Sequence, residues 1–266
     1  MPTIYHGSLR IVFLILLSTL YASAQDSTLA CTIEDLEPAD PAVPNSTPIG
    51  RILDGDMCVI AAAGNSRDPQ YIPYLKKVEK WRHPHPGDYH ADSDANSAEF
   101  AQMALAKLGV EKDLFEIECE IQPKATKYVR LHAIEVKLPY IGGWFAIHLA
   151  TEMLPDNKQN KENLSYGDDL RAEWHPRKLA ITMLPRLLGP DSEPYELFGR
   201  AEPGFERFKG LTEEQVIDGW YYWILNHENE LKKLKPTGDS VDYSEARCEK
   251  YLQKEGELAE PKSRHP

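Results

Sequence analysis

Apolar residues recur along most of the chain at the three- and four-residue spacing of amphipathic helices. The first such stripe begins at Ile49, another runs from Leu131 to Ile141, and a third begins at Ala180. Glycines follow the stripes and predict helix ends at Gly64-Asn65, Gly109, Gly142-Gly143 and Gly189. The pattern therefore predicts an all-α chain.

The sequence also predicts where two helices begin. Asp68 precedes Pro69 and is expected to cap a helix that begins there. Thr212 and Gln215 have the spacing of a capping box, which predicts a last long helix extending to Pro236. The segment Phe115–Ile121 is ambiguous, because its apolar residues fit both the alternation of a strand and one face of a helix.

Three of the expected helices end in similar sequences: FAQMALAKLG, AIEVKLPYIG and AITMLPRLLG. The spacing between the last two endings is longer, by about the size of the polar stretch that follows Pro155. Two helices in each interval form a unit that cannot bury its apolar face alone, so neighbouring units are expected to stack. The repeat predicts a short α-solenoid.

The segments DPQYIPYLKKV, AQMALAKLG and AIEVKLPYIGGWFAIHLATEML resemble HEAT-type helical repeats, including the short bacterial variety related to phycobilin-lyase repeats. WYYWILNHENELKKLKPTG resembles the closing helix of secreted members of that group. The resemblance covers about residues 65–240 and implies HEAT-like helical hairpins with a C-terminal capping helix. It also makes Phe115–Ile121 helical. Pro139 and Pro185 depart from the pattern, because proline interrupts a helix interior.

The N-terminus has the features of a secretory signal peptide. Arg10 precedes a short apolar run, Ile11–Leu20, and Ala22-Ser23-Ala24 provides a cleavage signal. The apolar stretch is shorter than the roughly 20 residues of a spanning helix, so no stable membrane span is expected after cleavage. We expect a signal peptide at 1–24, a Pro-rich linker at 25–48, the solenoid at 49–240 and a tail at 241–266. The protein is then exported, to the periplasm or the extracellular space.

Four cysteines lie beyond the cleavage site: Cys31, Cys58, Cys119 and Cys248. An oxidising compartment allows one or two disulfides, and three pairings are possible. Cys58 and Cys119 are equally well explained as small buried residues inside helices. Leu29-Ala30-Cys31 also resembles part of a lipid-attachment box, although the leucine is one position too close to the cysteine.

The net charge of −12 excludes a typical nucleic-acid partner, since neutralising phosphates requires clustered Lys and Arg. The 42% hydrophobic and 27% charged residues indicate a globular chain rather than a disordered one. The sequence contains no nucleophile elbow, P-loop or dinucleotide-binding fingerprint, so no catalytic residue and no cofactor is assigned.

Two groups of residues suggest a site. His83, His85 and His90 stand with several Asp residues in one polar loop, and imidazoles with carboxylates can bind a transition metal. The simpler interpretation is a solvated, Pro-broken loop between helices, because no two of these histidines have the spacing of an H-E-x-x-H helix and no cysteines flank the run. Trp220 and Trp223 belong to an aromatic run that spans all sides of one helical turn, either as a cap on the last repeat or as a binding surface.

The sequence thus predicts an exported HEAT-repeat protein that acts as a non-enzymatic scaffold for a protein partner. The alternative is a metal-dependent enzyme, or an enzyme accessory, that uses the loop His83–Asp94. A structural component of the cell envelope is a third possibility.

Overall fold

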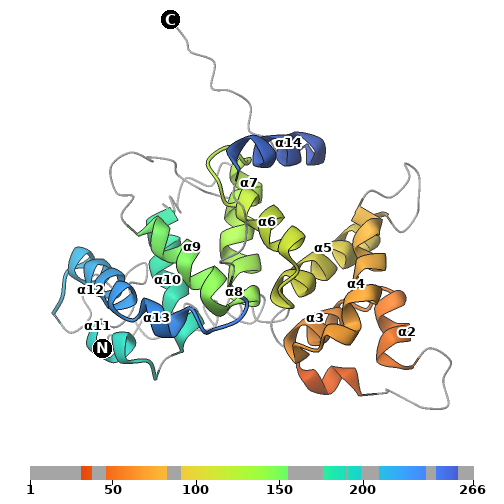
Figure 1. Ribbon diagram of the computed structural model, residues 1–266, viewed down its shortest axis with the longest axis horizontal. Coiled ribbons are helices and arrows are strands. Elements are labelled where there is room, and N and C mark those ends of the chain that lie inside the picture. The colour runs from red at the N-terminus through yellow and green to blue at the C-terminus, as the bar shows by residue number, and fades with distance from the viewer. Residues whose placement is uncertain are drawn as a thin grey trace, which may run out of the picture. The chain divides into compact units, whose positions relative to one another are not determined.

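The computed structural model describes residues 31–37, 46–82, 91–154, 176–189, 191–198, 210–237 and 244–256. Every regular element within these ranges is a helix, which confirms the all-α fold class (Figure 1). The chain divides into two units, Met1–Ala101 and Gln102–Pro266. The expected signal peptide lies outside the described residues, as do His83, His85 and His90.

The first unit contains short helices joined by tight connections. In chain order they are η1 (Ile33–Leu36), α2 (Pro48–Leu53), α3 (Met57–Ser66), η2 (Pro69–Tyr71), α4 (Ile72–Val78), η3 (Glu79–Arg82) and the start of α5 (Ala91–Lys107). Asp68 caps η2 through Gln70 N–H, as the sequence predicts, and the chain passes directly into α4. Helix α3 packs against η1, and α2 packs against α4.

The stripe that begins at Ile49 is divided between two helices, which corrects the expectation of one. Gly55 adopts a φ of 81°, and the Asp56 carboxylate then caps α3 by accepting from Cys58 N–H and Val59 N–H. The stop expected at Gly64-Asn65 is also wrong, because α3 continues to Ser66 and Arg67 takes the left-handed position. Asn65 instead donates its side-chain amide to the carbonyl of Cys31 at 3.0 Å.

The second unit continues α5 and adds helices out to residue 255. They are α6 (Glu111–Glu120), α7 (Lys127–His132), the π-helical turn η4 (Ala133–Lys137), α8 (Leu138–Ile141), α9 (Gly143–Met153), α10 (Pro176–Leu188), α11 (Glu193–Phe198), α12 (Glu213–Asn226), α13 (Glu228–Leu231) and α14 (Glu245–Glu255). The ambiguous segment lies in α6, so its helical interpretation is confirmed as far as Glu120. The glycines at 109, 142 and 189 all have positive φ, as expected of helix ends.

The two prolines that break the repeat pattern are accommodated differently. Pro139 stands in the first turn of α8, directly after the π-helical turn, where the helix already changes its hydrogen-bond spacing. Pro185 lies inside α10. Helices α9 and α10 pack against each other (Figure 1).

The N-terminus of α9 is closed by a distant part of the chain. Trp144 N–H donates to the Leu234 carbonyl at 2.9 Å, and Phe145 N–H donates to the Pro236 carbonyl at 3.0 Å. A Cβ atom on Gly143 would collide with the backbone of Lys235, so only glycine fits this approach. The segment after α13 therefore provides the cap that α9 lacks from its own side chains.

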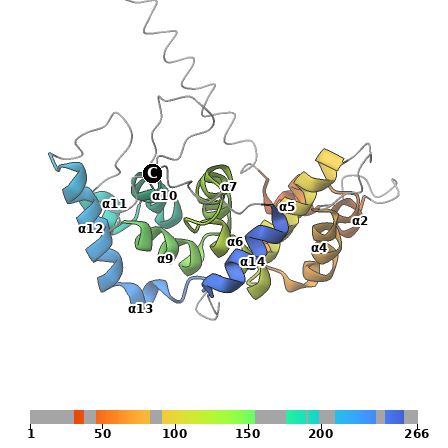
Figure 2. The same ribbon diagram turned by 90° about the horizontal axis from the view of Figure 1, so that it is seen from above.

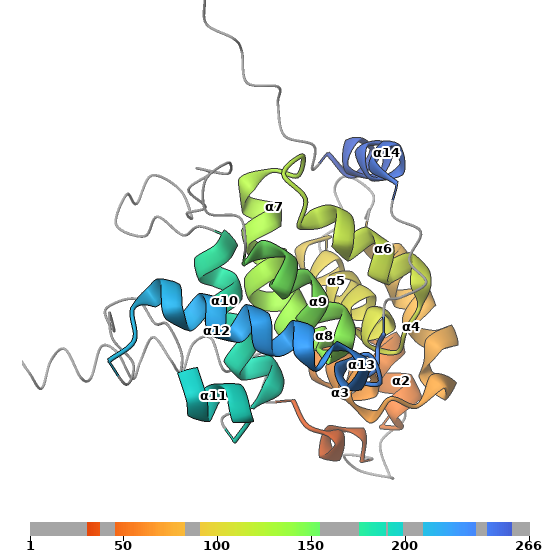
Figure 3. The ribbon, with the colours of Figure 1, turned by 60° about the vertical axis from the view of Figure 1, so that its left-hand side comes forward.

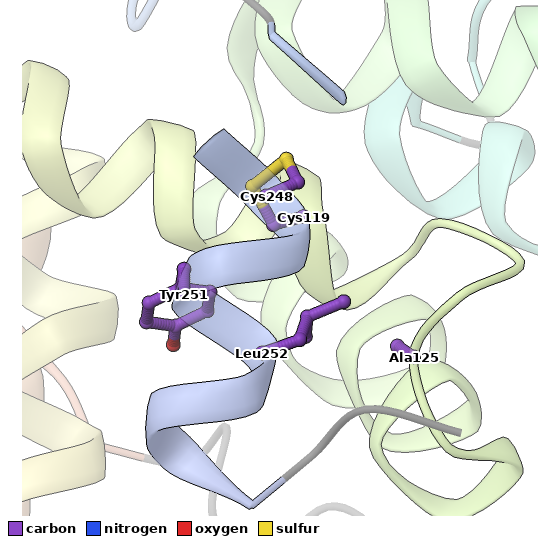
Figure 4. Packing of buried hydrophobic residues seen from close by; sticks show 5 residues of the cluster. All are labelled: Cys119, Ala125, Cys248, Tyr251 and Leu252. Carbon is purple, nitrogen blue, oxygen red and sulfur yellow. A yellow bond between two sulfur atoms is a disulfide. The ribbon is translucent and has the colours of Figure 1, made fainter. Parts of the chain in front are cut away.

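The residues expected to be a C-terminal tail include helix α14, which packs against α6 (Figure 2). A disulfide joins Cys119 of α6 to Cys248 of α14, with 5.1 Å between the Cα atoms. Around it lies a buried cluster of Ala125, Tyr251 and Leu252 (Figure 4). The hydrophobic pattern did not indicate this helix, because its sequence is mostly polar and its buried face consists only of Cys248, Tyr251 and Leu252.

A buried ion pair lies next to this cluster. The Lys137 Nζ atom is 2.6 Å from Glu120 Oε2, and their side chains are 4% and 0% exposed. Tyr251 donates its hydroxyl to Glu120 Oε1 at 2.8 Å, and Lys137 also donates to Gln102 Oε1 at 3.2 Å. The pair thus joins α6 to the π-helical turn and to α14, with its remaining polar atoms hydrogen-bonded rather than left bare.

Candidate functional site

Helices α11 and α12 lie side by side in the second unit and include the aromatic run noted in the sequence (Figure 3). The capping box predicted at Thr212 is present: Gln215 N–H donates to Thr212 Oγ1, and Thr212 N–H donates to Gln215 Oε1. Gly219 permits the close approach, because a Cβ atom there would collide with the ring of Phe198 in α11. Helices α11 and α12 thus pack together through the Phe198 ring, which lies directly on Gly219.

The two tryptophans named from the sequence have different surroundings. Trp220 is 0% exposed and belongs to the core. Trp223 is half-buried, donates Nε1–H to Glu193 Oε2 at 3.1 Å and stacks on His227 with 4.1 Å between ring centroids. Of the two, only Trp223 reaches the surface, where it links α11 to the end of α12.

The same histidine marks the end of α12. His227 Nδ1 lies 2.8 Å from the carbonyl of Trp223, and its backbone leaves the helical conformation. The long helix expected to continue to Pro236 therefore ends at Asn226, and α13 is a separate turn.

Large apolar side chains on this helix pair are exposed to solvent. Leu197 is 50% exposed, Tyr222 is 61% exposed and Leu225 is 44% exposed. Tyr222 and Leu225 are three residues apart, so they share one side of α12. The sequence signal for them was available, because Val216, Trp220 and Ile224 mark the buried side of α12 and leave the opposite side to solvent.

The exposed charged residues beside them are acidic. Neither α11 nor α12 contains a lysine or arginine, whereas Glu193, Glu196, Glu214 and Asp218 are exposed. Arg177 of α10 lies 3.3 Å from Glu214 and offsets that one charge. We define the α11–α12 face as these exposed side chains: Glu193, Glu196, Leu197, Glu214, Asp218, Tyr222 and Leu225. It combines apolar area with negative charge.

A second feature of the unit is a carboxyl group with an altered pKa. Burial raises the pKa of Glu118 in α6 to about 7, and the negative charge of Glu152 in α9 adds to this. Glu152 is exposed, and its Oε1 lies 3.3 Å from His148 Nε2. Glu118 can therefore exchange a proton near neutral pH, but the two glutamates come from helix positions that no sequence motif singled out.

The comparisons add no neighbour to this picture: no protein family, curated protein or solved structure matches the chain. Among the helices that the structure describes, none combines the length and the apolar character needed to cross a bilayer.

Proposed function

We propose that this chain is an exported helical-repeat protein of the HEAT type that binds a protein partner and catalyses no reaction. The observation that carries the proposal is the α11–α12 face, where exposed leucine and tyrosine side chains stand among carboxylates on helices without basic residues. Burial of exposed apolar side chains against a partner lowers the free energy of the complex.

The charge on the face indicates the chemistry of the partner. Glu196 and Asp218 are exposed on adjacent helices, and the chain as a whole has a net charge of −12. A surface of this kind selects a partner segment with apolar side chains flanked by Lys or Arg, because complementary charge speeds association and disfavours acidic competitors. Such binding should weaken as salt is added.

Two disulfides support export. They join Cys31 to Cys58 and Cys119 to Cys248, and no described cysteine is free. Disulfides of this kind persist in oxidising compartments and are rare in the cytosol.

The test is affinity capture of the tagged full chain from its own host, compared with two double variants. Tyr222→Ser with Leu225→Ser removes the apolar side chains, and Glu196→Lys with Asp218→Lys reverses the charge. We expect one partner to be enriched by the wild-type chain and lost with each double variant. The matched control is Tyr128→Ser, which removes a 63% exposed tyrosine from α7 and should retain the partner.

The result that contradicts the proposal is equally specific. A partner held as well by both double variants as by the wild type binds elsewhere on the chain. The substituted side chains are exposed, so each variant should fold as the wild type does. Circular dichroism of each variant checks this and excludes unfolding as the reason for a loss of binding.

A further inference from the structure

The N-terminal disulfide of the first unit has a carboxylate beside it. Cys31 and Cys58 are joined, with 5.1 Å between their Cα atoms, and Asp35 of η1 lies close to both. One carboxylate oxygen of Asp35 and the two sulfur atoms all lie within 4.8 Å of one another. Two sulfurs and one oxygen are a donor set that proteins use for zinc.

Contacts other than the disulfide hold each of the three donors in place. Cys58 is the second residue of α3, and its N–H donates to Asp56 Oδ1 at 3.1 Å. The Cys31 carbonyl accepts from Asn65 of the same helix at 3.0 Å. Asp35 Oδ2 accepts from Thr32 N–H at 2.7 Å, which leaves Oδ1 of that carboxylate for another partner.

Arg51 adds a link between these two segments. Its guanidinium donates to the Asp35 carbonyl at 3.0 Å and forms an ion pair with Asp56 at 2.8 Å. The backbone around Asp35 is thereby joined to the residue that caps α3. Breaking the sulfur–sulfur bond therefore leaves η1 and α3 connected through Asn65 and Arg51, with the three donors still gathered.

We propose that reduction converts the Cys31–Cys58 disulfide into a binding site for a thiophilic divalent cation such as Zn²⁺. A dithiol supplies two electrons and two protons, so that it becomes a disulfide while the two cysteines become thiols. The cation then displaces both thiol protons and binds two thiolate sulfurs and the Asp35 carboxylate. Water, or a group from a partner, completes the fourth position of a tetrahedron.

The environment of the site favours this exchange. Cys58 lies in the first turn of α3, where the positive end of the helix dipole stabilises negative charge on its sulfur. Cys58 is also half-buried rather than fully enclosed, so a reductant can approach the disulfide from Cys58, although Cys31 is only 6% exposed. The other disulfide offers a contrast, because Cys119 and Cys248 are 0% and 2% exposed.

The experiment is a Co²⁺ titration of the full chain before and after reduction with a phosphine. The phosphine takes up oxygen from water as it is oxidised, so it introduces no competing thiol. We expect the oxidised chain to show no thiolate-to-cobalt charge-transfer absorption and the reduced chain to bind one Co²⁺ with that absorption. Zn²⁺ should displace the cobalt and abolish the band.

Two variants distinguish this site from any other. Asp35→Asn removes the ligand charge but keeps an oxygen for Thr32 N–H. It should weaken Co²⁺ binding by at least about tenfold, since loss of even an outer-shell partner of a metal has an effect of that size. The matched control is Asp54→Asn, which changes a nearby exposed carboxylate outside the cluster and should bind as the wild type does. Cys31→Ser with Cys58→Ser should eliminate the band although Cys119 and Cys248 remain.

Either of two results overturns the proposal. One is the absence of the charge-transfer band in the reduced wild-type chain whose circular dichroism is still helical. The other is equal affinity of the Asp35→Asn and wild-type chains, which would place the cation on the sulfurs alone or elsewhere.

Discussion

The two disulfides of this chain are built into their surroundings in different ways. Cys31 and Cys58 are 27 residues apart and join a short turn to the start of a helix, beside the polar side chains of Asp35 and Asn65. Cys119 and Cys248 are 129 residues apart and join two helices within a cluster that contains Ala125, Tyr251 and Leu252. The first is partly open to solvent at Cys58, although Cys31 is only 6% exposed, and the second is enclosed at both cysteines.

The difference shows that the sequence separation of a disulfide sets its contribution to stability, whereas its surroundings set how easily it is reduced. A long closed loop restricts the unfolded chain more than a short one does. Burial among apolar side chains limits access by a reductant, whereas a polar, half-open site permits exchange. In this chain the long loop coincides with burial, so the second disulfide is expected to contribute stability and the first to be the one that reacts.

Removing each disulfide is the most direct test of this contrast and has the largest expected effect. The loop-closure relation gives a loss of about 5 kcal/mol for Cys119→Ala with Cys248→Ala and about 3.5 kcal/mol for Cys31→Ala with Cys58→Ala. Urea unfolding followed by circular dichroism measures both. An equal or larger loss on removal of the N-terminal pair would reverse the assignment of roles.

The ion pair beside the second disulfide sharpens the comparison. In Lys137→Met the Glu120 carboxylate stays buried without its cation, and we expect the unfolding free energy to fall by about 4 kcal/mol. The double variant Lys137→Met with Glu120→Gln removes the uncompensated charge and should recover most of that loss, since Gln keeps an acceptor for Tyr251. Denaturant unfolding of both variants is the measurement. A single variant within about 1 kcal/mol of the wild type would mean that water reaches this part of the unit.

Local signals in the sequence account for much of the helical fold. The capping box at Thr212, the cap at Asp68 and the helix ends at Gly109, Gly142 and Gly189 are all present, because each depends on residues within one turn. The single stripe predicted from Ile49 was wrong for a related reason: periodicity continues across Gly55, where the positive φ turns the chain.

Features that depend on distant residues were not predictable in the same way. Glu118 and Glu120 are both glutamates of α6, yet Glu118 is half-buried and Glu120 is fully buried. Glu120 contacts Lys137 of the π-helical turn and Tyr251 of α14, and both partners are distant in sequence. The pairing of the four cysteines was open for the same reason. The α11–α12 face differs, because the spacing of Val216, Trp220 and Ile224 marks the buried side of α12 in the sequence itself. The prediction nevertheless named Trp220, which the fold buries, and did not name Leu225, which the fold exposes.

The smallest expected effect concerns Glu118, the residue directly before Cys119. Its pKa is raised to about 7 in the folded chain from an ordinary value near 4.5, so the folded state holds a proton that the unfolded state releases. The stabilisation from this protonated group is complete below about pH 4.5 and is lost as the pH rises through about 7. Because the side chain is partly exposed, solvent screening reduces the effect to about 1 kcal/mol.

Glu118→Gln removes the ionisable group and should therefore leave stability at pH 4.5 unchanged and raise it by about 1 kcal/mol at pH 8. Urea unfolding of the variant and the wild type at several pH values between 4.5 and 8 measures the difference. Glu152→Gln is the informative control: burial is the larger cause of the shift, so this variant should reduce the pH dependence without abolishing it. Identical pH dependence in wild type and Glu118→Gln would show that the Glu118 side chain is as well hydrated as a surface glutamate. The buried surroundings of the second disulfide would then include Cys119 but not its neighbour Glu118.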